Sequence, residues 1–85
     1  MTDHLLRVDR DDGTPLSDQL VDQIRLMAAS GVLSPGDRLP TVRQLAVDLG
    51  INRNTAAKAY GLSREDGVIV TRSGGGIPSL RGREG

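Results

Sequence analysis

The sequence predicts a mainly α-helical fold: three helices followed by a small β-hairpin. In three segments, apolar residues recur at helical spacing between residues that typically start or stop helices. Near the C-terminus, a run rich in Val and Ile is followed by three consecutive glycines, which is typical of a strand and a hairpin tip. With 85 residues, the chain is long enough for one small domain. We assign this domain to residues 14–80, after an N-terminal arm or short strand (1–13) and before a frayed tail (81–85).

The composition excludes several classes of protein and site. The chain has no cysteine and one histidine, so it lacks the side chains for a disulfide framework, a thiolate metal site or a metal site with three histidine ligands. Its single aromatic residue is Tyr60, which we expect in the core rather than as a platform for stacked bases. No apolar run is long enough to span a membrane and no signal peptide is visible, so a cytoplasmic protein is expected. We therefore expect no enzyme, no cofactor and no metal site.

The first helix is expected over about residues 15–30. Pro15 stands at its start, where the missing N–H of proline leaves no helical bond unmade. Apolar residues follow at helical spacing, and Gly31 is a typical helix stop. Residues 31–40 then indicate a turn, a short extended piece and a second turn around Pro35-Gly36.

The second and third helices are short and follow each other closely. Thr41 and Gln44 form a capping box, in which each side chain is expected to satisfy the other residue's free backbone N–H. This helix ends at Gly50 after about eight residues, and Asn52 caps a third helix that runs from Arg53 to about Asp66. Two short helices joined by a turn of three or four residues have the layout of a helix-turn-helix.

A β-hairpin is expected after the third helix. Residues 68–71 favour a strand, residues 72–76 a flexible tip, and residues 77–80 a returning strand that Pro78 weakens. A helix-turn-helix followed by such a hairpin is a winged helix-turn-helix. The glycines of the tip do not indicate a phosphate-binding loop, because no Lys-Ser or Lys-Thr pair follows them.

Polar residues at the start of the third helix have types that suit double-stranded DNA. Arg53 can bond O6 and N7 of guanine, Asn54 can bond N6 and N7 of adenine, and Thr55 can contact a thymine methyl. Lys58 follows one turn later, and the helix N-terminus itself attracts a phosphate. By spacing alone, these four residues could also form a solvated helix face.

The charges are balanced in number but not in position. Acidic and basic side chains number 11 each, which argues against a generic nucleic-acid coat. The first 40 residues hold seven acids and four arginines, whereas residues 41–85 hold seven bases and four acids. We therefore expect a dipolar molecule with a basic middle.

Several short motifs follow one another over about residues 14–76. They are Pro15-Leu16-x-x-Gln19-x-x-x-x-Ile24, Ser30-Gly31-x-Leu33-x-Pro35-Gly36-Asp37-Arg38-Leu39-Pro40-Thr41-x-Arg43, Leu45-Ala46-x-x-Leu49-Gly50-Ile51-Asn52-Arg53-Asn54-Thr55, Ala59-Tyr60 and Glu65-Asp66-Gly67. Together they resemble the DNA-binding domain of GntR-type bacterial transcription regulators. The Pro-Leu-x-x-Gln opening and the Asn-Thr-x-x-x-Ala-Tyr run are most similar to the YtrA and MocR branches.

This resemblance implies DNA-binding roles and a homodimer on a palindromic operator. Residues of the third helix would enter the major groove, Arg43 would contact DNA from the second helix, and the glycine-rich wing would touch the minor groove or the backbone. The DNA-binding residues that the resemblance implies are Thr41, Arg43, Asn52, Arg53, Asn54, Thr55, Lys58, Arg72 and Gly75.

The chain departs from the family pattern at several points. Ser63 stands where the family usually has Leu, and Gly61 lies in mid-helix, so both bear on how the third helix packs. The chain also ends where members of the family attach an effector or dimerisation domain. We therefore expect either an excised domain or a very short regulator, with any effector bound by a domain absent from this chain.

The predicted function is a sequence-specific, DNA-binding transcription regulator, and more specifically a repressor that occludes its operator. The alternative is a winged-helix protein-interaction module, which zero net charge and a reduced wing favour slightly. Arg43 has an alternative of its own, as an ion-pair partner of Asp48 or Asp37 instead of a DNA contact.

Overall fold

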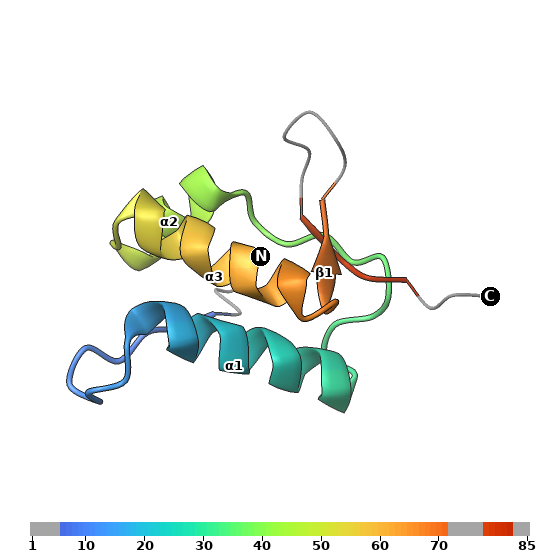
Figure 1. Ribbon diagram of the computed structural model, residues 1–85, viewed down its shortest axis with the longest axis horizontal. Helices are drawn as coiled ribbons and strands as arrows, with labels where there is room; N and C mark the ends of the chain where they lie inside the picture. The colour runs from blue at the N-terminus through green and yellow to red at the C-terminus, as the bar shows by residue number, and fades with distance from the viewer. Residues whose placement is uncertain (1–5, 72–77, 83–85) are drawn as a thin grey trace.

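The computed structural model describes residues 6–71 and 78–82 of the chain. Its elements in chain order are three helices and two short strands: α1 (Leu16–Ser30), α2 (Val42–Leu49), α3 (Arg53–Glu65), β1 (Ile69–Val70) and β2 (Ser79–Leu80). Figure 1 shows α1 and α3 side by side, with α2 near the start of α3 and β1 beyond its end. The predicted fold of three helices and a small hairpin is confirmed. None of the helices described is long and apolar enough to cross a bilayer.

Helix α1 begins one residue later than the sequence predicts. Pro15 is the N-cap residue, with φ −52° and ψ 140°, so it precedes the helix instead of occupying its first turn. The helix ends as predicted, because Gly31 adopts a left-handed conformation with φ 87°, which costs glycine little.

The predicted capping box at the start of α2 is only half formed. Thr41 Oγ1 accepts a hydrogen bond from the backbone N–H of Gln44 at 3.1 Å. The Gln44 side chain, however, donates to Asp48 Oδ1 at 2.7 Å instead of reaching back to Thr41. Side chains four residues apart are neighbours on a helix, so this pairing takes the place of the reciprocal cap.

Helix α3 is the centre of the core and packs against both α1 and α2. Ala56 and Ala59 are fully buried, and such small side chains allow neighbouring helices to approach closely. Tyr60 is also buried, and its hydroxyl donates to the Pro40 carbonyl oxygen at 2.6 Å. Tyr60 is therefore a core residue, as predicted, and burial raises the pKa of its phenol above the ordinary value of about 10.

The hairpin is shorter than predicted, and a third segment pairs with it. Its antiparallel strands have two residues each, with Ile69 opposite Leu80. The extended piece before α2 runs along the other edge of β2, where Arg38 forms a β-bridge with Ser79. This pairing was not predicted, and it anchors the chain just before α2. The predicted tip, residues 72–76, lies outside the described residues.

Residues 6–13, called the arm below, are ordered but do not form a strand. Gln23 on α1 bonds both the N–H and the carbonyl of Arg7, and Gln19 bonds both backbone groups of Asp9. Each glutamine amide thus supplies the acceptor and the donor that the backbone of a neighbouring strand would otherwise supply. Leu6 is buried in the core, which further holds the arm against the fold.

Candidate nucleic-acid interface

The turn between α2 and α3 is held by bonds at both helix ends. Gly50 is left-handed, with φ 66° and ψ 37°, and the N–H of Ile51 donates to the Ala46 carbonyl at 3.0 Å. These are features of the Schellman motif, which ends a helix and redirects the chain. Asn52 then starts α3, because its Oδ1 accepts a hydrogen bond from the Asn54 N–H at 2.7 Å. The predicted helix-turn-helix geometry is confirmed.

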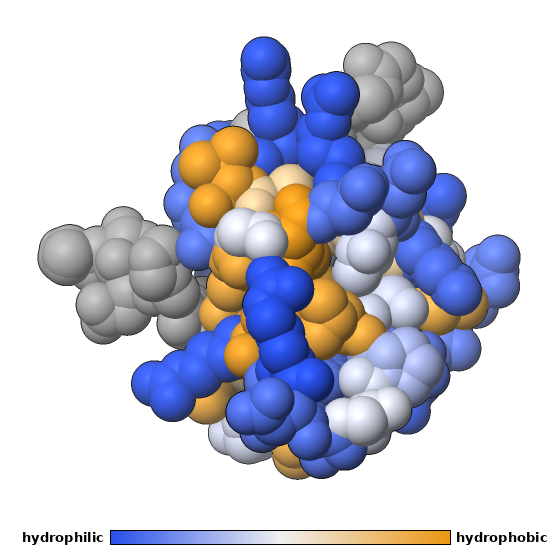
Figure 2. Space-filling model, turned by 90° about the vertical axis from the view of Figure 1, so that its left-hand side faces the viewer, coloured by the Kyte–Doolittle hydropathy of each residue, from blue (hydrophilic) through white to orange (hydrophobic). Residues whose placement is uncertain are grey.

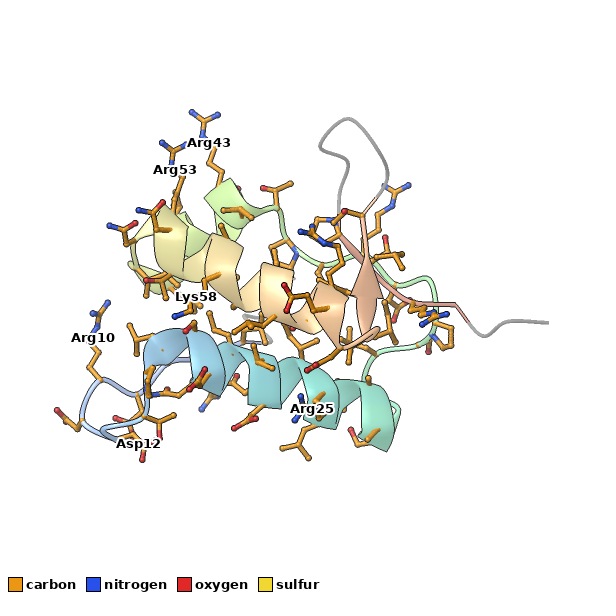
Figure 3. All side chains as sticks on the ribbon, in the orientation of Figure 1. Arg10, Asp12, Arg25, Arg43, Arg53 and Lys58 are labelled. Atoms are coloured by element: carbon orange, nitrogen blue, oxygen red, sulfur yellow. The ribbon has the colours of Figure 1, made fainter. Side chains whose placement is uncertain are left out.

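Two arginines stand together beside this turn. Arg43 on α2 and Arg53 at the start of α3 line one shallow hollow with Ala46, Val47, Gly50 and Ile51. Figure 3 shows both arginine side chains pointing the same way, away from α1. Within residues 6–71 and 78–82, neither arginine forms a hydrogen bond or an ion pair, so the alternative pairing of Arg43 with Asp37 or Asp48 is not seen.

The surface around the turn combines positive charge with apolar groups. Figure 2 views this end of the molecule and shows apolar surface near the middle, with polar side chains around it and projecting above it. Val47 adds to the apolar part, since it is 71% exposed. Guanidinium groups bind phosphate and base-edge acceptors, and apolar side chains contact thymine methyls, so this surface offers the chemistry that DNA recognition uses.

The other predicted residues near the helix starts are placed in different environments. Thr41 and Asn52 use their side-chain oxygens to cap α2 and α3. Asn54 is exposed, whereas Thr55 is half-buried. Asn54 is therefore the more accessible of the two for an external partner.

Lys58 is separated from the two arginines. It lies five residues after Arg53, which corresponds to a rotation of about 140° around the helix axis. Figure 3 shows Lys58 on the α1 side of α3, whereas Arg53 points away from α1. Arg72 and Gly75, the wing residues of the predicted site, lie outside the described residues.

One residue at the turn was not predicted from the sequence. Arg10, on the arm, donates from Nη2 to the Gly50 carbonyl oxygen at 2.7 Å. The two residues are 40 positions apart, and Arg10 lies in a run of aspartates, so no local pattern indicates the contact.

Comparison with known proteins agrees with this architecture. Residues 16–78 match the family described as bacterial regulatory proteins, gntR family. The chain is similar to the HTH-type transcriptional repressor YtrA of Bacillus subtilis (strain 168), with 36% identity over 72 residues. These residues are 85% of this chain and 55% of that protein, and the chain spans about half the length of the first curated relatives it matches.

Two solved structures have a similar fold. YtrA from Sulfolobus acidocaldarius, a GntR-family transcription factor, has a TM-score of 0.85 and 34% identity, over 95% of this chain and 84% of that chain. AraR(DBD) in complex with operator ORX1 has a TM-score of 0.75 and 25% identity, over 92% of this chain and 99% of that chain. The named relatives are transcription regulators, which agrees with the prediction that this chain is not an enzyme. Since the family match covers most of the chain and the winged-helix structures are alike, the chain belongs to the GntR family of bacterial regulatory proteins.

Proposed function

We propose that this chain is the DNA-binding part of a transcription regulator, and that the start of α3 enters the major groove of double-stranded DNA. The observation that carries the proposal is the pair Arg43 and Arg53, which stand together with no bonding partner in the described ranges. Unpaired guanidinium groups are suited to phosphate oxygens and to guanine O6 and N7. The similar AraR(DBD), solved with operator ORX1, supports DNA as the partner.

The exposed residues at the turn take the main roles in this proposal. Arg53 reads guanine from the first turn of α3, and the exposed Asn54 reads adenine. Arg43 binds from α2, beside Arg53, to a phosphate or a base edge. Both arginines can act on one stretch of duplex because they line the same hollow.

The remaining predicted residues take secondary roles. Thr41 and Asn52 cap the helices and keep the helix starts in place, where backbone N–H groups favour a phosphate. Thr55 contacts the edge of the site beside Asn54, and Arg72 and Gly75 belong to the wing. Lys58 lies on the α1 side of α3, so we give it only a contact with the flanking phosphate backbone.

We further propose that the protein is a cytoplasmic repressor that binds a palindromic operator as a homodimer. The net charge is zero and one domain makes few phosphate contacts, so a single domain should bind DNA weakly. Two domains would place their α3 helices in successive major grooves, about 34 Å apart. Repression is supported by the name of the similar B. subtilis protein, a transcriptional repressor.

Affinity for a selected duplex tests the proposal. The wild-type chain is used to select a duplex from a random-sequence pool, and the Kd is compared with that of a shuffled duplex at several salt concentrations. Arg43→Ala and Arg53→Ala should each weaken binding to the selected duplex by about 5- to 160-fold, because a good base contact discriminates by roughly 1–3 kcal/mol. Arg25→Ala is the control, since Arg25 lies on α1 and pairs with Asp66.

The outcomes separate the two predicted functions. Preference of the wild-type chain for the selected duplex, lost in the two arginine variants and kept in Arg25→Ala, supports sequence-specific binding. Equal affinity of the wild-type chain for both duplexes refutes it. Unchanged affinity in both arginine variants would instead favour the interaction module.

A further inference from the structure

We propose that Arg10 is a positioning residue for α3, and that its bond to Gly50 holds the helix-turn-helix in the orientation that sequence-specific binding requires. This inference rests on the proposed function and extends it to the arm, which contains none of the predicted DNA contacts. The geometry assigns Arg10 an indirect role, since its guanidinium group is engaged by the protein itself.

The bond acts at the point where the chain changes direction. Arg10 Nη2 donates to the Gly50 carbonyl oxygen at 2.7 Å, while the N–H of Gly50 donates back into α2. An arginine near the C-terminus of a helix satisfies terminal carbonyls and interacts favourably with the helix dipole. Gly50 is therefore held from both sides, by α2 through its N–H and by the arm through its carbonyl.

The arm is itself fixed to α1, so the bond connects the turn to a stable part of the fold. Gln19 and Gln23 on α1 bond the backbone of the arm at two positions, Arg7 and Asp9. Arg10 follows Asp9 directly, and Figure 3 shows its side chain reaching from the arm toward the turn. A continuous series of hydrogen bonds thus runs from α1 through the arm to the turn.

The short helix α2 makes this connection important. It has eight residues, and among the helices and strands it packs chiefly against α3. Binding constellations need side chains held within about 0.5 Å of their productive positions. Arg53 lies three residues after Gly50, and Arg43 lies on the other side of the turn, so a relaxed turn would shift one arginine relative to the other.

Two variants isolate the role of the bond. Arg10→Ala removes the bond and one positive charge. Arg7→Ala is the matched control, because Arg7 is on the same arm and exposed, and its side chain makes no bond with any described residue. Arg10→Lys keeps the charge and a hydrogen-bond donor, so it should keep part of the sequence-specific binding. Binding is measured with the full chain on the duplex selected by the wild-type chain and on its shuffled version.

We expect Arg10→Ala to weaken binding to the selected duplex by about fivefold, the effect of losing one ordinary hydrogen bond. Binding to the shuffled duplex, the salt dependence and the Arg7→Ala control should stay close to the wild type. Hydrogen exchange gives a second readout: the hydrogen-bonded amides of Gly50 and Ile51 should exchange faster in Arg10→Ala, while that of Ile24 in α1 should not. General destabilisation would accelerate all three.

Several results would overturn the proposal. Equal losses on both duplexes with a smaller salt slope would mean that Arg10 contacts a phosphate directly. Equal affinity of Arg10→Ala and Arg7→Ala for the selected duplex would mean that the bond does not contribute to binding. Unchanged hydrogen exchange at Ile51 in Arg10→Ala would mean that the bond does not hold the turn. If Arg10→Ala does not fold, failure of Arg10→Lys to differ from Arg7→Ala refutes the role. Failure of the wild-type chain to select any sequence would instead refute the proposed function.

Discussion

Replacement of Ser63 by alanine should stabilise this protein. Ser63 lies in α3 and is 1% exposed, and its Oγ is the one buried side-chain nitrogen or oxygen atom of the described residues without a hydrogen-bond partner. An unsatisfied buried hydroxyl costs about 1–3 kcal/mol, and alanine is about 0.5 kcal/mol better than serine inside a helix. Part of this gain is offset, because the packing of one oxygen atom is lost. We therefore expect Ser63→Ala to raise the free energy of unfolding by roughly 1–2 kcal/mol.

Thermal and urea unfolding measure this change. In a domain of this size, 1 kcal/mol corresponds to about 4–8 °C in Tm, and the urea m-value should not change. Ser17→Ala is the matched control, since Ser17 is a buried serine in α1, 5% exposed, whose hydroxyl is not among the unpartnered buried atoms. It should gain no more than about 0.5 kcal/mol from helix propensity. If Ser63→Ala is no more stable than Ser17→Ala, the Ser63 hydroxyl has a partner and the reasoning is refuted.

Three further predictions concern glycine positions, pH and a surface ion pair. Gly61→Ala should raise the free energy of unfolding by up to about 1 kcal/mol, whereas Gly50→Ala should lower it by about 1–2 kcal/mol. At both positions an added Cβ meets nothing within 4 Å, but of the two only Gly50 has a positive φ, which strains alanine. Equal changes in urea unfolding would contradict this. The raised pKa of Tyr60 keeps the folded state protonated when the unfolded state ionises, so the free energy of unfolding should hold below about pH 10 and fall above it. Urea midpoints against pH, with tyrosinate absorbance, check this fall, which should be smaller in Tyr60→Phe. Arg25→Ala should lower the free energy of unfolding by less than about 1 kcal/mol, and by less still at high salt, because both members of its pair with Asp66 are exposed. A larger, salt-independent decrease in urea unfolding would refute this.

Local signals predicted the helices and the turn well. Gly31 and Gly50 end helices in the left-handed conformation, and Asn52 caps α3 with its own side chain, so each boundary depends on residues next to it in the sequence. The partial exception is the capping box. Gln44 has two acceptable partners within one turn, and sequence alone does not decide between them.

Contacts between distant segments could not be predicted in this way. The bond from Arg10 to Gly50 and the docking of the arm on Gln19 depend on how α1 lies against the rest of the fold. The candidate site shows the same limit. The sequence grouped Lys58 with Arg53 by proximity along α3, but rotation around the helix axis separates them, whereas folding brings Arg43 on α2 next to Arg53.

The arrangement of charge in space shows how a chain with zero net charge can offer DNA a positive face. Exposed aspartates gather on the arm and α1, at positions Asp11, Asp12, Asp18 and Asp22. Figure 3 shows Asp12 on the opposite side from Arg43 and Arg53. Charges are screened over about 8 Å at physiological salt, so aspartates on that opposite side weaken attraction at the arginines little. In the proposed binding mode, they would repel DNA that approaches α1 and so favour approach from the side of the two arginines. Neutral composition alone is consequently no argument for an interaction module, because the separation of charge between the two sides decides what a partner meets.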